Sequence, residues 1–345
     1  MENVLEIIAW YKNNFRDLPW RKTQDPYKIW LSEIILQQTQ IVQGLGYYER
    51  FISQYPDIQA LANAEQASVL KLWQGLGYYS RARNLHKTAQ IIVNQYNGKF
   101  PEDYPSILKL PGIGPYTAAA IMSFAFNQPF ACLDGNVFRV LSRIYGIESP
   151  IDDGKSRPQF MAILDQWIQG QNPRIFNNAI MEFGALMCKP DLPKCHECPL
   201  SIDCFAYKNN AVKSFPVKSK SLKKRNRWFN YLLFKVDGKM AMIKRHKKDI
   251  WQHLYELPLI ESEREISENH ILNQIESVCI NRIDKLEYSG EFRHILTHQI
   301  IQARFWTVHC ESAVVFNDPN VFWVNISDIQ NYPVSVLIEK FLVCL

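Results

Sequence analysis

Residues 110–118 read Leu-Pro-Gly-Ile-Gly-Pro-Tyr-Thr-Ala, and this stretch decides how the N-terminal half of the chain folds. It lies between two segments whose apolar residues have helical spacing. Gly112 and Gly114 permit a tight turn that leaves backbone N–H groups exposed at the start of the next helix. Such groups, aided by the helix dipole, bind a phosphate oxygen without reading base sequence. A simple helix–helix turn is the alternative interpretation of the two glycines alone.

The first two hundred residues show helical spacing on both sides of this turn. Turn signals such as Asn97-Gly98 separate the segments. The flanking Leu-Pro and Thr-Ala match the helix-hairpin-helix motif of DNA-binding proteins. We therefore expect a mainly α-helical domain over residues 1–207. Its predicted helices cover residues 4–15, 29–42, 69–73, 82–96, 118–126 and 137–145.

The character of the sequence changes after residue 207. Residues 213–227 contain seven lysines and arginines and no acid, which predicts a solvated basic linker over 208–227. A β-rich run follows, with Asp237-Gly238 as a hairpin signal. An α+β domain is expected over 228–345. Its predicted strands cover 228–236, 240–244, 303–310 and 321–326, and its predicted helices cover 265–278 and 334–342.

The composition of the 345 residues is that of a globular protein with two domains, since 47% are hydrophobic and 21% are charged. No run approaches the roughly 18 apolar residues of a membrane span, and Glu2 and Glu6 argue against a signal peptide. These features predict a cytoplasmic protein and exclude the secreted, membrane and disordered classes. The net charge of +5 permits a polyanionic partner without proving one.

Four cysteines crowd into 17 residues with the spacing Cys-x6-Cys-x2-Cys-x5-Cys. In a reducing compartment this crowding indicates metal ligation and not a disulfide framework. Four thiolates in such a span can hold one tetrahedral zinc ion or one iron–sulfur cube. A zinc ribbon usually presents two Cys-x2-Cys pairs, and here there is one, which favours the cluster. The four are Cys188, Cys195, Cys198 and Cys204.

Two carboxylic acids stand in contrasting contexts. Glu33 lies in an apolar helical segment, where Ile29 and Trp30 share its face, and desolvation there favours the protonated form of an acid. An exposed glutamate on an amphipathic helix is the alternative. Asp134 precedes a helical segment at an N-cap position, where backbone N–H groups hold a carboxylate ionised, although a plain structural cap fits as well. Cleavage of a glycosidic bond needs one acid that donates a proton and one carboxylate that stabilises the positive charge on the sugar.

The hairpin, the stretch Leu133-Asp134-Gly135-Asn136-Val137 and the cysteine set together resemble the endonuclease III superfamily of DNA glycosylases. Within that superfamily, residues 30–33, 36–39 and 75–86 look like the MutY-type adenine DNA glycosylases. The resemblance covers nearly all of residues 1–207. It is looser from residue 228, where this family carries a Nudix-like domain.

The resemblance implies an enzyme that removes adenine mispaired with 8-oxoguanine or guanine in double-stranded DNA, which initiates base-excision repair. Glu33 would protonate N7 of the flipped adenine, and Asp134 would stabilise the oxocarbenium ion, with Tyr116 and Asn136 hydrogen-bonding around that centre. Monofunctional chemistry is expected, because bifunctional relatives have a lysine where Tyr116 stands and tyrosine cannot form a Schiff base.

The same resemblance assigns further roles. The four cysteines would hold a [4Fe-4S] cluster, and the protein would act as a monomer without membrane attachment, associated with the nucleoid in a prokaryote. Phosphate contacts would come from Gly112, Gly114 and Arg81. Substrate-binding residues would be Arg16, Leu18, Trp20, Arg21, Gln38, Ile41, Leu76, Tyr78 and Asn178, the last at a position where the family more often has glutamine or glutamate.

The C-terminal domain departs from the family pattern at two places. Leu296-Thr297-His298 resembles the Phe-Ser-His loop that recognises 8-oxoguanine, and Thr297 keeps the hydroxyl of the serine. His298 is interpreted as a base contact or as a core histidine. Residues 264–269 match the metal-binding Nudix motif only in part, so we expect no pyrophosphatase activity.

Two other functions compete with adenine excision. A thymine or oxidised-pyrimidine glycosylase is possible on the same scaffold, but Glu33 argues against it because a pyrimidine offers no N7. A non-catalytic iron–sulfur DNA-binding module would not need Glu33 and Asp134 together.

Overall fold

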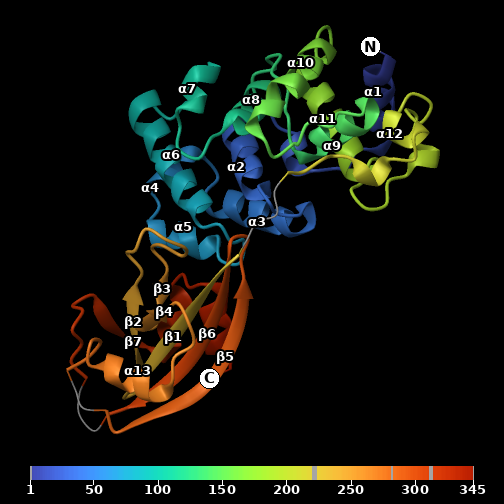
Figure 1. The fold of residues 1–345 in the computed structure, drawn as a ribbon. Helices are drawn as coiled ribbons and strands as arrows, with labels where there is room; N and C mark the ends of the chain where they lie inside the picture. Colours follow the sequence, from blue (N-terminus) through green and yellow to red (C-terminus); the bar gives the residue numbers. More distant parts are fainter. Residues whose placement is uncertain (1, 220–223, 281–282, 311–313, 345) are drawn as a thin grey trace. The chain divides into compact units, whose positions relative to one another are not determined.

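The computed structural model describes residues 2–219, 224–280, 283–310 and 314–344, which fall into two compact units (Figure 1). The helical unit comprises Met1–Asn63 and Asn84–Lys220, and the sheet unit comprises Ala64–Arg83 and Ser221–Leu345.

This division differs from the boundaries expected from the sequence, because residues 64–83 group with the C-terminal part of the chain. Side-chain hydrogen bonds explain the grouping. The Nδ1 atom of His253 lies 2.6 Å from Oε1 of Gln66, and Nζ of Lys71 donates to the carbonyl of Tyr332. The segment contains α5 (Gln66–Leu72) and the first residues of α6 (Ser80–Tyr96).

The helical unit is built from short helices that pack in pairs. Helix α2 (Pro26–Leu36) packs against α3 (Ile41–Gln54) and α8 (Pro115–Phe124), while α11 (Pro173–Leu186) packs against α1 (Glu2–Asn14) and α9 (Gly135–Tyr145). The remaining α-helices of this unit are α4 (Ile58–Asn63), α7 (Tyr104–Leu108), α10 (Arg157–Trp167), α12 (Phe205–Lys208) and most of α6.

The helix predicted over residues 29–42 is wrong as a single element. Helix α2 ends at Leu36 and α3 begins at Ile41, and Gln38 between them has φ +55°. A left-handed residue cannot continue a right-handed helix, so the chain turns there. The turn takes Gln37 and Gln38 off the helix on which Glu33 lies.

A close approach between α9 and α11 shapes the core of the helical unit. A Cβ atom at Gly184 would lie 2.7 Å from Cβ of Asn136 and 3.0 Å from its carbonyl oxygen. Glycine therefore lets the two helices come into backbone contact. Buried hydrophobic side chains pack around this contact and form the core; among them are Val140, Leu141, Phe160, Phe176, Ile180 and Phe183.

The sheet unit has one seven-stranded sheet whose main path runs β3-β2-β1-β6-β5, with β4 paired to β1 and β7 paired to β2. Strands β1 and β6 are parallel, and the other pairs are antiparallel. The strands are β1 (Arg225–Val236), β2 (Lys239–Lys244), β3 (Tyr255–Glu256), β4 (Leu259–Ser262), β5 (Lys285–Ile295), β6 (Gln299–His309) and β7 (Val321–Asn325).

Helices cover both faces of this sheet, which explains why most of β1 is buried. On one face Leu232 and Phe234 share a core with Ile271 of α13 (Glu268–Ile275). On the other face Phe305 stacks on Phe341 of α14 (Val336–Val343), with ring centroids 3.8 Å apart. The expected hairpin is present, because Asp237 and Gly238 both have positive φ between β1 and β2.

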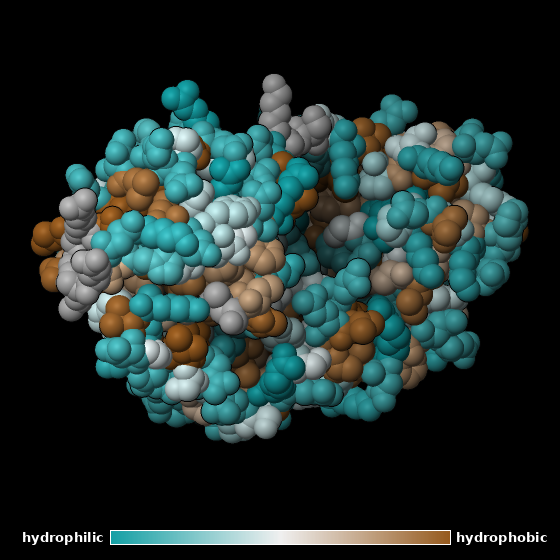
Figure 2. Space-filling model, turned by 90° about the horizontal axis from the view of Figure 1, so that it is seen from below, coloured by the Kyte–Doolittle hydropathy of each residue, from teal (hydrophilic) through white to brown (hydrophobic). Residues whose placement is uncertain are grey.

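Hydrophobic residues on the face drawn in Figure 2 form small groups separated by hydrophilic ones. Among the helices of the described residues, none combines the length and the apolar composition needed to cross a membrane.

Candidate active site

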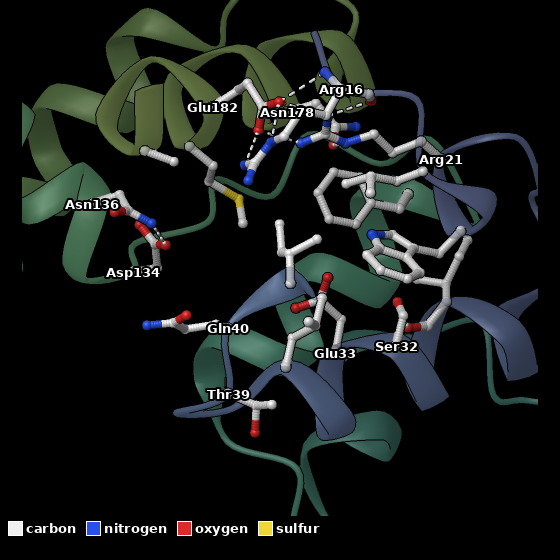
Figure 3. A pocket seen from close by; sticks show the side chains of 18 of the residues that line it. Arg16, Arg21, Ser32, Glu33, Thr39, Gln40, Asp134, Asn136, Asn178 and Glu182 are labelled. Carbon is white, nitrogen blue, oxygen red and sulfur yellow. Dashed lines mark hydrogen bonds and ion pairs between the residues drawn. The ribbon is translucent and has the colours of Figure 1, made fainter. Parts of the chain in front are cut away.

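A pocket of about 530 Å³ opens in the helical unit (Figure 3). It brings together side chains from the N-terminal loop, α2, α8, α9 and α11, which are far apart in the sequence. The residues predicted from the sequence that line it are Arg16, Leu18, Trp20, Arg21, Glu33, Ile41, Tyr116, Asp134, Asn136 and Asn178.

Glu33 lies in the middle of α2 and is only 8% exposed. Burial raises the pKa of Glu33 to about 7; a hydrogen bond with Tyr116 and the charge of Arg21 lower the pKa, and the charge of Asp134 raises it. Glu33 is therefore not the exposed glutamate of the alternative interpretation. A carboxyl with this pKa carries a proton for part of the time at neutral pH and can donate it.

Asp134 is the N-cap of α9. Its Oδ1 accepts a hydrogen bond from the backbone N of Val137, and its Oδ2 accepts one from Nδ2 of Asn136, both at 2.8 Å. Burial raises the pKa of Asp134 above its ordinary value, although these hydrogen bonds and the charge of Arg139 act to lower it. The cap expected from the sequence is present and favours the ionised carboxylate, but the effect of burial on the pKa of Asp134 is larger.

Asn136 links the Asp134 carboxylate to Arg139 through two hydrogen bonds. While its Nδ2 donates to Asp134, its Oδ1 accepts a 2.8 Å hydrogen bond from Nη2 of Arg139. Arg139 is held in turn, because it donates to the carbonyls of Cys188 and Gly184. This chain of contacts fixes the direction in which the Asp134 carboxylate points into the pocket.

Tyr116 is the second residue of α8 and stands beside both acids. Burial and the charges of Glu33 and Asp134 raise the pKa of Tyr116 well above its ordinary value. Its hydroxyl lies 4.0 Å from Sδ of Met181. Tyr116 is therefore a neutral hydrogen-bonding group and not a nucleophile at this place in the pocket.

A buried ion-pair cluster forms the opposite wall, as Figure 3 shows. The Glu182 carboxylate accepts from Nη2 of Arg16 at 2.5 Å and from Nη2 of Arg21 at 2.8 Å. Burial acts to raise the pKa of Glu182, but these hydrogen bonds outweigh it and lower the pKa to about 2. The Asn178 amide is also engaged, since its Oδ1 accepts from Nε of Arg21 and its Nδ2 donates to the carbonyl of Arg174.

Glu182 is a buried pocket residue that was not predicted from the sequence. It is 1% exposed and is the acceptor for both predicted pocket arginines. A weak signal was available, because Glu182 follows Asn178 by one helical turn on an otherwise apolar helix face. Other pocket residues that were not predicted are Ile29, Ser32, Leu36, Thr39, Gln40, Val42, Phe124, Arg139, Arg174, Met181, Ala185 and Pro190.

The sheet unit contains a second pocket, of about 410 Å³. It gathers the predicted residues Leu76, Tyr78, Thr297 and His298, and the hydroxyls of Tyr78 and Thr297 are hydrogen-bonded to each other. Tyr78 is 45% exposed with φ +47°, and Thr297 lies in the turn between β5 and β6. His298 is exposed, so its interpretation as a core histidine is wrong.

Arg81 and Gln38, like the two glycines of the hairpin, line neither of these pockets. Arg81 is 9% exposed, and its guanidinium donates to the carbonyls of Leu76 and Gly77 and lies over the Trp73 ring. This corrects its assignment to phosphate binding, because its charge faces the interior of the sheet unit. Gln38 is exposed in the turn that ends α2.

The glycine turn has the expected form with one difference. Gly112 has φ +77°, and a Cβ there would lie 2.7 Å from Cβ of Asn84, so this position requires glycine. Gly114 has extended backbone and is the N-cap of α8. Both glycines are exposed, which leaves the backbone N–H groups of the turn accessible.

The four clustered cysteines line a single hollow of the helical unit. Among the described residues no three His, Cys, Asp or Glu side chains converge on a position for one metal ion. A lone zinc ion needs thiolates about 2.3 Å from one point, whereas an iron–sulfur cluster spans a wider gap. Nη1 of Arg143 lies 3.4 Å from Sγ of Cys188, which supplies positive charge beside the thiolates. Four thiols in one hollow beside a cationic group are a donor set of the kind that can hold an iron–sulfur cluster.

Comparison with known proteins agrees with this architecture. Residues 31–168 match the family described as HhH-GPD superfamily base excision DNA repair protein, and residues 230–343 match the NUDIX domain family. A structure described as a thermostable thymine-DNA glycosylase is similar to 60% of this chain and 95% of its own, with a TM-score of 0.56 and 32% identity. A non-covalent endonuclease III–DNA complex, at 24% identity and a TM-score of 0.53, shares the fold.

The full-length similarity is to adenine DNA glycosylases. The chain is 37% identical over 345 residues to the one from Buchnera aphidicola subsp. Baizongia pistaciae, an alignment that covers 97% of this chain and 95% of the relative. It is 38% identical over 209 residues to the Homo sapiens adenine DNA glycosylase, covering 58% of this chain and 38% of the relative. Since the similarity extends through both units, the chain belongs to the adenine DNA glycosylase family of base-excision repair enzymes.

Proposed function

We propose that this enzyme excises adenine from double-stranded DNA where the adenine is paired with 8-oxoguanine or guanine. The observation that carries the proposal is the presence of Glu33, with its pKa of about 7, and the capped carboxylate of Asp134 in one pocket. Membership of the adenine DNA glycosylase family supports the choice of base. A purine also offers N7 as a proton acceptor for Glu33, which a pyrimidine lacks.

Glu33 donates its proton to N7 of an adenine that has left the base stack and entered the pocket. Protonation makes adenine a neutral leaving group, and the electron pair of the glycosidic bond moves onto the base. The sugar acquires positive charge, which the Asp134 carboxylate stabilises. Water then adds to the sugar carbon and gives up a proton to the Glu33 carboxylate, which leaves an abasic site and restores the acid form of Glu33.

Asn136 positions Asp134, and Tyr116 hydrogen-bonds with Glu33. Because a phenol cannot form an iminium with the sugar, the enzyme is monofunctional and does not cut the strand. Borohydride should therefore trap no covalent enzyme–DNA adduct. Efficient trapping on adenine-containing duplex would contradict this assignment.

The second pocket, in the sheet unit, reads the base opposite adenine. The hydroxyls of Thr297 and Tyr78 stand in it and can hydrogen-bond to the oxidised edge of 8-oxoguanine, which differs from guanine at N7 and C8. A Thr297→Ala substitution should reduce the preference for 8-oxoguanine over guanine while leaving the excision of adenine opposite guanine nearly unchanged.

The cysteine set holds a [4Fe-4S] cluster, with Cys188, Cys195, Cys198 and Cys204 as the ligands. When bound, the cluster supplies structural rigidity to the loop that carries these residues. Four iron atoms per chain are expected by elemental analysis, and Cys198→Ser should lower the iron content and the melting temperature. One zinc ion per chain in place of iron would contradict the assignment.

The exposed glycine turn binds a phosphate of the DNA backbone through the N–H groups near Gly112 and Gly114. Gly112→Ala should weaken binding to any duplex regardless of sequence, because the contact is made to phosphate alone.

The central experiment uses duplexes with one labelled adenine opposite 8-oxoguanine, guanine, cytosine or thymine, followed by treatment with alkali. Alkali-dependent cleavage is expected opposite 8-oxoguanine and guanine. Glu33→Gln and Asp134→Asn should each slow the single-turnover excision by about 100-fold or more. Glu6→Gln, at an exposed position of α1, is the matched control. Release of thymine in place of adenine, or no cleavage after alkali, would overturn the proposal.

A further inference from the structure

A cleft of about 420 Å³ adjoins the active-site pocket in the helical unit, and we call it the linker cleft. It lies between the N-terminal end of α9 and the first part of the segment predicted as a basic linker. Its lining contains four cationic side chains and no acidic one. The lining residues are Gly135, Asn136, Arg139, Arg143, Ile151, Pro190, Lys213, Phe215, Pro216 and Lys218.

Arg143 fixes the linker against the helical unit. Its Nε donates to the carbonyls of Val212 and Phe215, both at 3.2 Å, and its Nη2 donates to the carbonyl of Pro190 at 2.9 Å. Arg143 is 3% exposed, so these contacts are shielded from water. The segment is therefore held in place on both sides of Lys213.

A second set of contacts fixes the segment near Lys218. The backbone N of Ile151 donates to the carbonyl of Val217 at 3.0 Å, and the backbone N of Ser219 donates to Oδ1 of Asp152 at 2.9 Å. The two lysines thus project from an anchored stretch of backbone, which lowers the entropy lost when they bind a ligand.

Within the described part of the chain, the two lysines have no acidic partner. Both side chains reach solvent, and among the ion pairs between described residues none involves Lys213 or Lys218. The arginines of the cleft differ, because Arg139 and Arg143 donate to backbone carbonyls. The lysines are therefore the cationic groups available to an anionic ligand.

The cleft lies next to the active-site pocket, because Asn136, Arg139 and Pro190 line both. Asn136 is also hydrogen-bonded to Asp134, the residue that faces the sugar in the proposed reaction. A nucleotide whose base lies in the pocket has its two phosphates attached to that same sugar. A phosphate that leaves the sugar beside Asn136 would reach the linker cleft, which Asn136 also lines.

We propose that the linker cleft binds the phosphodiester backbone of the strand that carries the excised adenine, directly beside the extruded nucleotide, through Lys213 and Lys218. This inference rests on the proposed function for the identity of the strand. It assigns to the linker a role in holding the substrate strand, separate from the phosphate contact of the glycine turn.

The test measures binding to a duplex that holds 2′-fluoro-2′-deoxyadenosine, whose glycosidic bond resists cleavage, opposite 8-oxoguanine. Three modified duplexes each carry one uncharged methylphosphonate in place of a phosphate. The replaced phosphate is the one 5′ to that nucleotide, the one 3′ to it, or the one at the matching place in the opposite strand. One of the two substitutions in the adenine strand should weaken binding by the wild-type enzyme about eightfold at 0.1 M salt, the value expected when one phosphate is no longer neutralised by the protein.

The double variant Lys213→Ala, Lys218→Ala should bind the unmodified duplex more weakly and should no longer respond to that methylphosphonate. A plot of the logarithm of the DNA association constant against the logarithm of the salt concentration has a negative slope. For the double variant this slope should be less steep by about 0.9 for each phosphate that is left without a cationic partner. Lys12→Ala, Lys155→Ala removes the same charge from exposed positions outside the cleft and should keep the wild-type response.

An equal methylphosphonate effect in the wild type and the double variant would overturn the inference, as would an effect confined to the opposite strand. Failure of the proposed function is seen separately, because it shows as no adenine release by the wild-type enzyme. Circular dichroism of both double variants checks the fold, and the single variants Lys213→Gln and Lys218→Gln repeat the measurement with polar side chains of similar length.

Discussion

Glu33 and Asp134 reach one pocket from two different helices, and the charge of Asp134 raises the pKa of Glu33. The coupling favours a state in which Glu33 holds the proton while Asp134 is ionised and hydrogen-bonded to Asn136. Both acids are buried, and the hydrogen bonds from Val137 and Asn136 to the Asp134 carboxylate favour its ionised form, which lets the two acids take opposite roles.

Adenine excision should depend on pH through Glu33. Its pKa is about 7, so the acid form predominates below that pH and is lost above it. We expect the single-turnover rate constant to fall about tenfold per pH unit well above the pKa of Glu33, and to fall also at acid pH, where Asp134 takes up a proton and can no longer stabilise the charged sugar. The residual rate of Glu33→Gln should lack the fall at alkaline pH. A wild-type rate that rises as the solution becomes alkaline would contradict the role of Glu33 as the acid.

Burial of Glu33 should also make stability depend on pH. The pKa of this acid is 4.5 in the unfolded chain and about 7 in the folded one, so between these values the folded protein keeps a proton that the unfolded chain has released. Stability is therefore lost as pH rises through this window.

The variant Glu33→Gln has no such ionisation cost. We expect it to exceed the wild type in free energy of unfolding by up to about 3 kcal/mol at pH 8, with the difference disappearing near pH 4. Urea denaturation at both pH values measures this. A variant that is less stable than the wild type at pH 8 would show that Glu33 is not desolvated.

The parts of this site that depend on short stretches of sequence could be predicted from the sequence. The N-cap at Asp134, the left-handed Gly112 and the hairpin at Asp237-Gly238 each require only a few neighbouring residues. Their conformations follow from side-chain hydrogen bonding or from the missing Cβ of glycine. For that reason the structure agrees with the sequence at these three places.

Features that depend on distant partners could not be predicted. Glu182 pairs with Arg16, which lies 166 residues away, and nothing in either local sequence indicates the other. Strand β5 was missed although Leu286, Tyr288 and Phe292 alternate with polar residues, because Gly290 interrupts the apolar pattern and most side chains of the strand are exposed. Arg81 was assigned to phosphate on its charge, whereas the structure uses that charge against interior carbonyls.

Removing the charge of Glu182 should destabilise the helical unit at neutral pH. In Glu182→Gln the guanidinium groups of Arg16 and Arg21 lose their shared carboxylate in a largely buried site, and we expect a loss of about 3 kcal/mol in the free energy of unfolding. The pKa of Glu182 is about 2 in the folded protein, so its contribution is complete above the ordinary value of 4.5 and is lost as pH falls toward 2.

The difference between wild type and Glu182→Gln should therefore be constant from about pH 8 to pH 5 and should shrink at lower pH. Glu287→Gln, which removes an exposed carboxylate paired with Lys285, is the matched control and should leave the stability nearly unchanged at neutral pH. Equal behaviour of the two variants would mean that the buried cluster does not support the fold.

Gly184 should be indispensable for the geometry of Asp134. An alanine there would place its Cβ 2.7 Å from Cβ of Asn136, and relief of this clash must move α11 away from α9. We expect Gly184→Ala to cost about 1–3 kcal/mol of stability and, because Asn136 orients Asp134, to slow adenine excision more than it weakens duplex binding. Gly154→Ala adds the same methyl group where no atom lies within 4 Å and should change neither quantity. If Gly184→Ala lost stability but kept the full excision rate, the hydrogen bond between Asn136 and Asp134 would not be needed to stabilise the charged sugar.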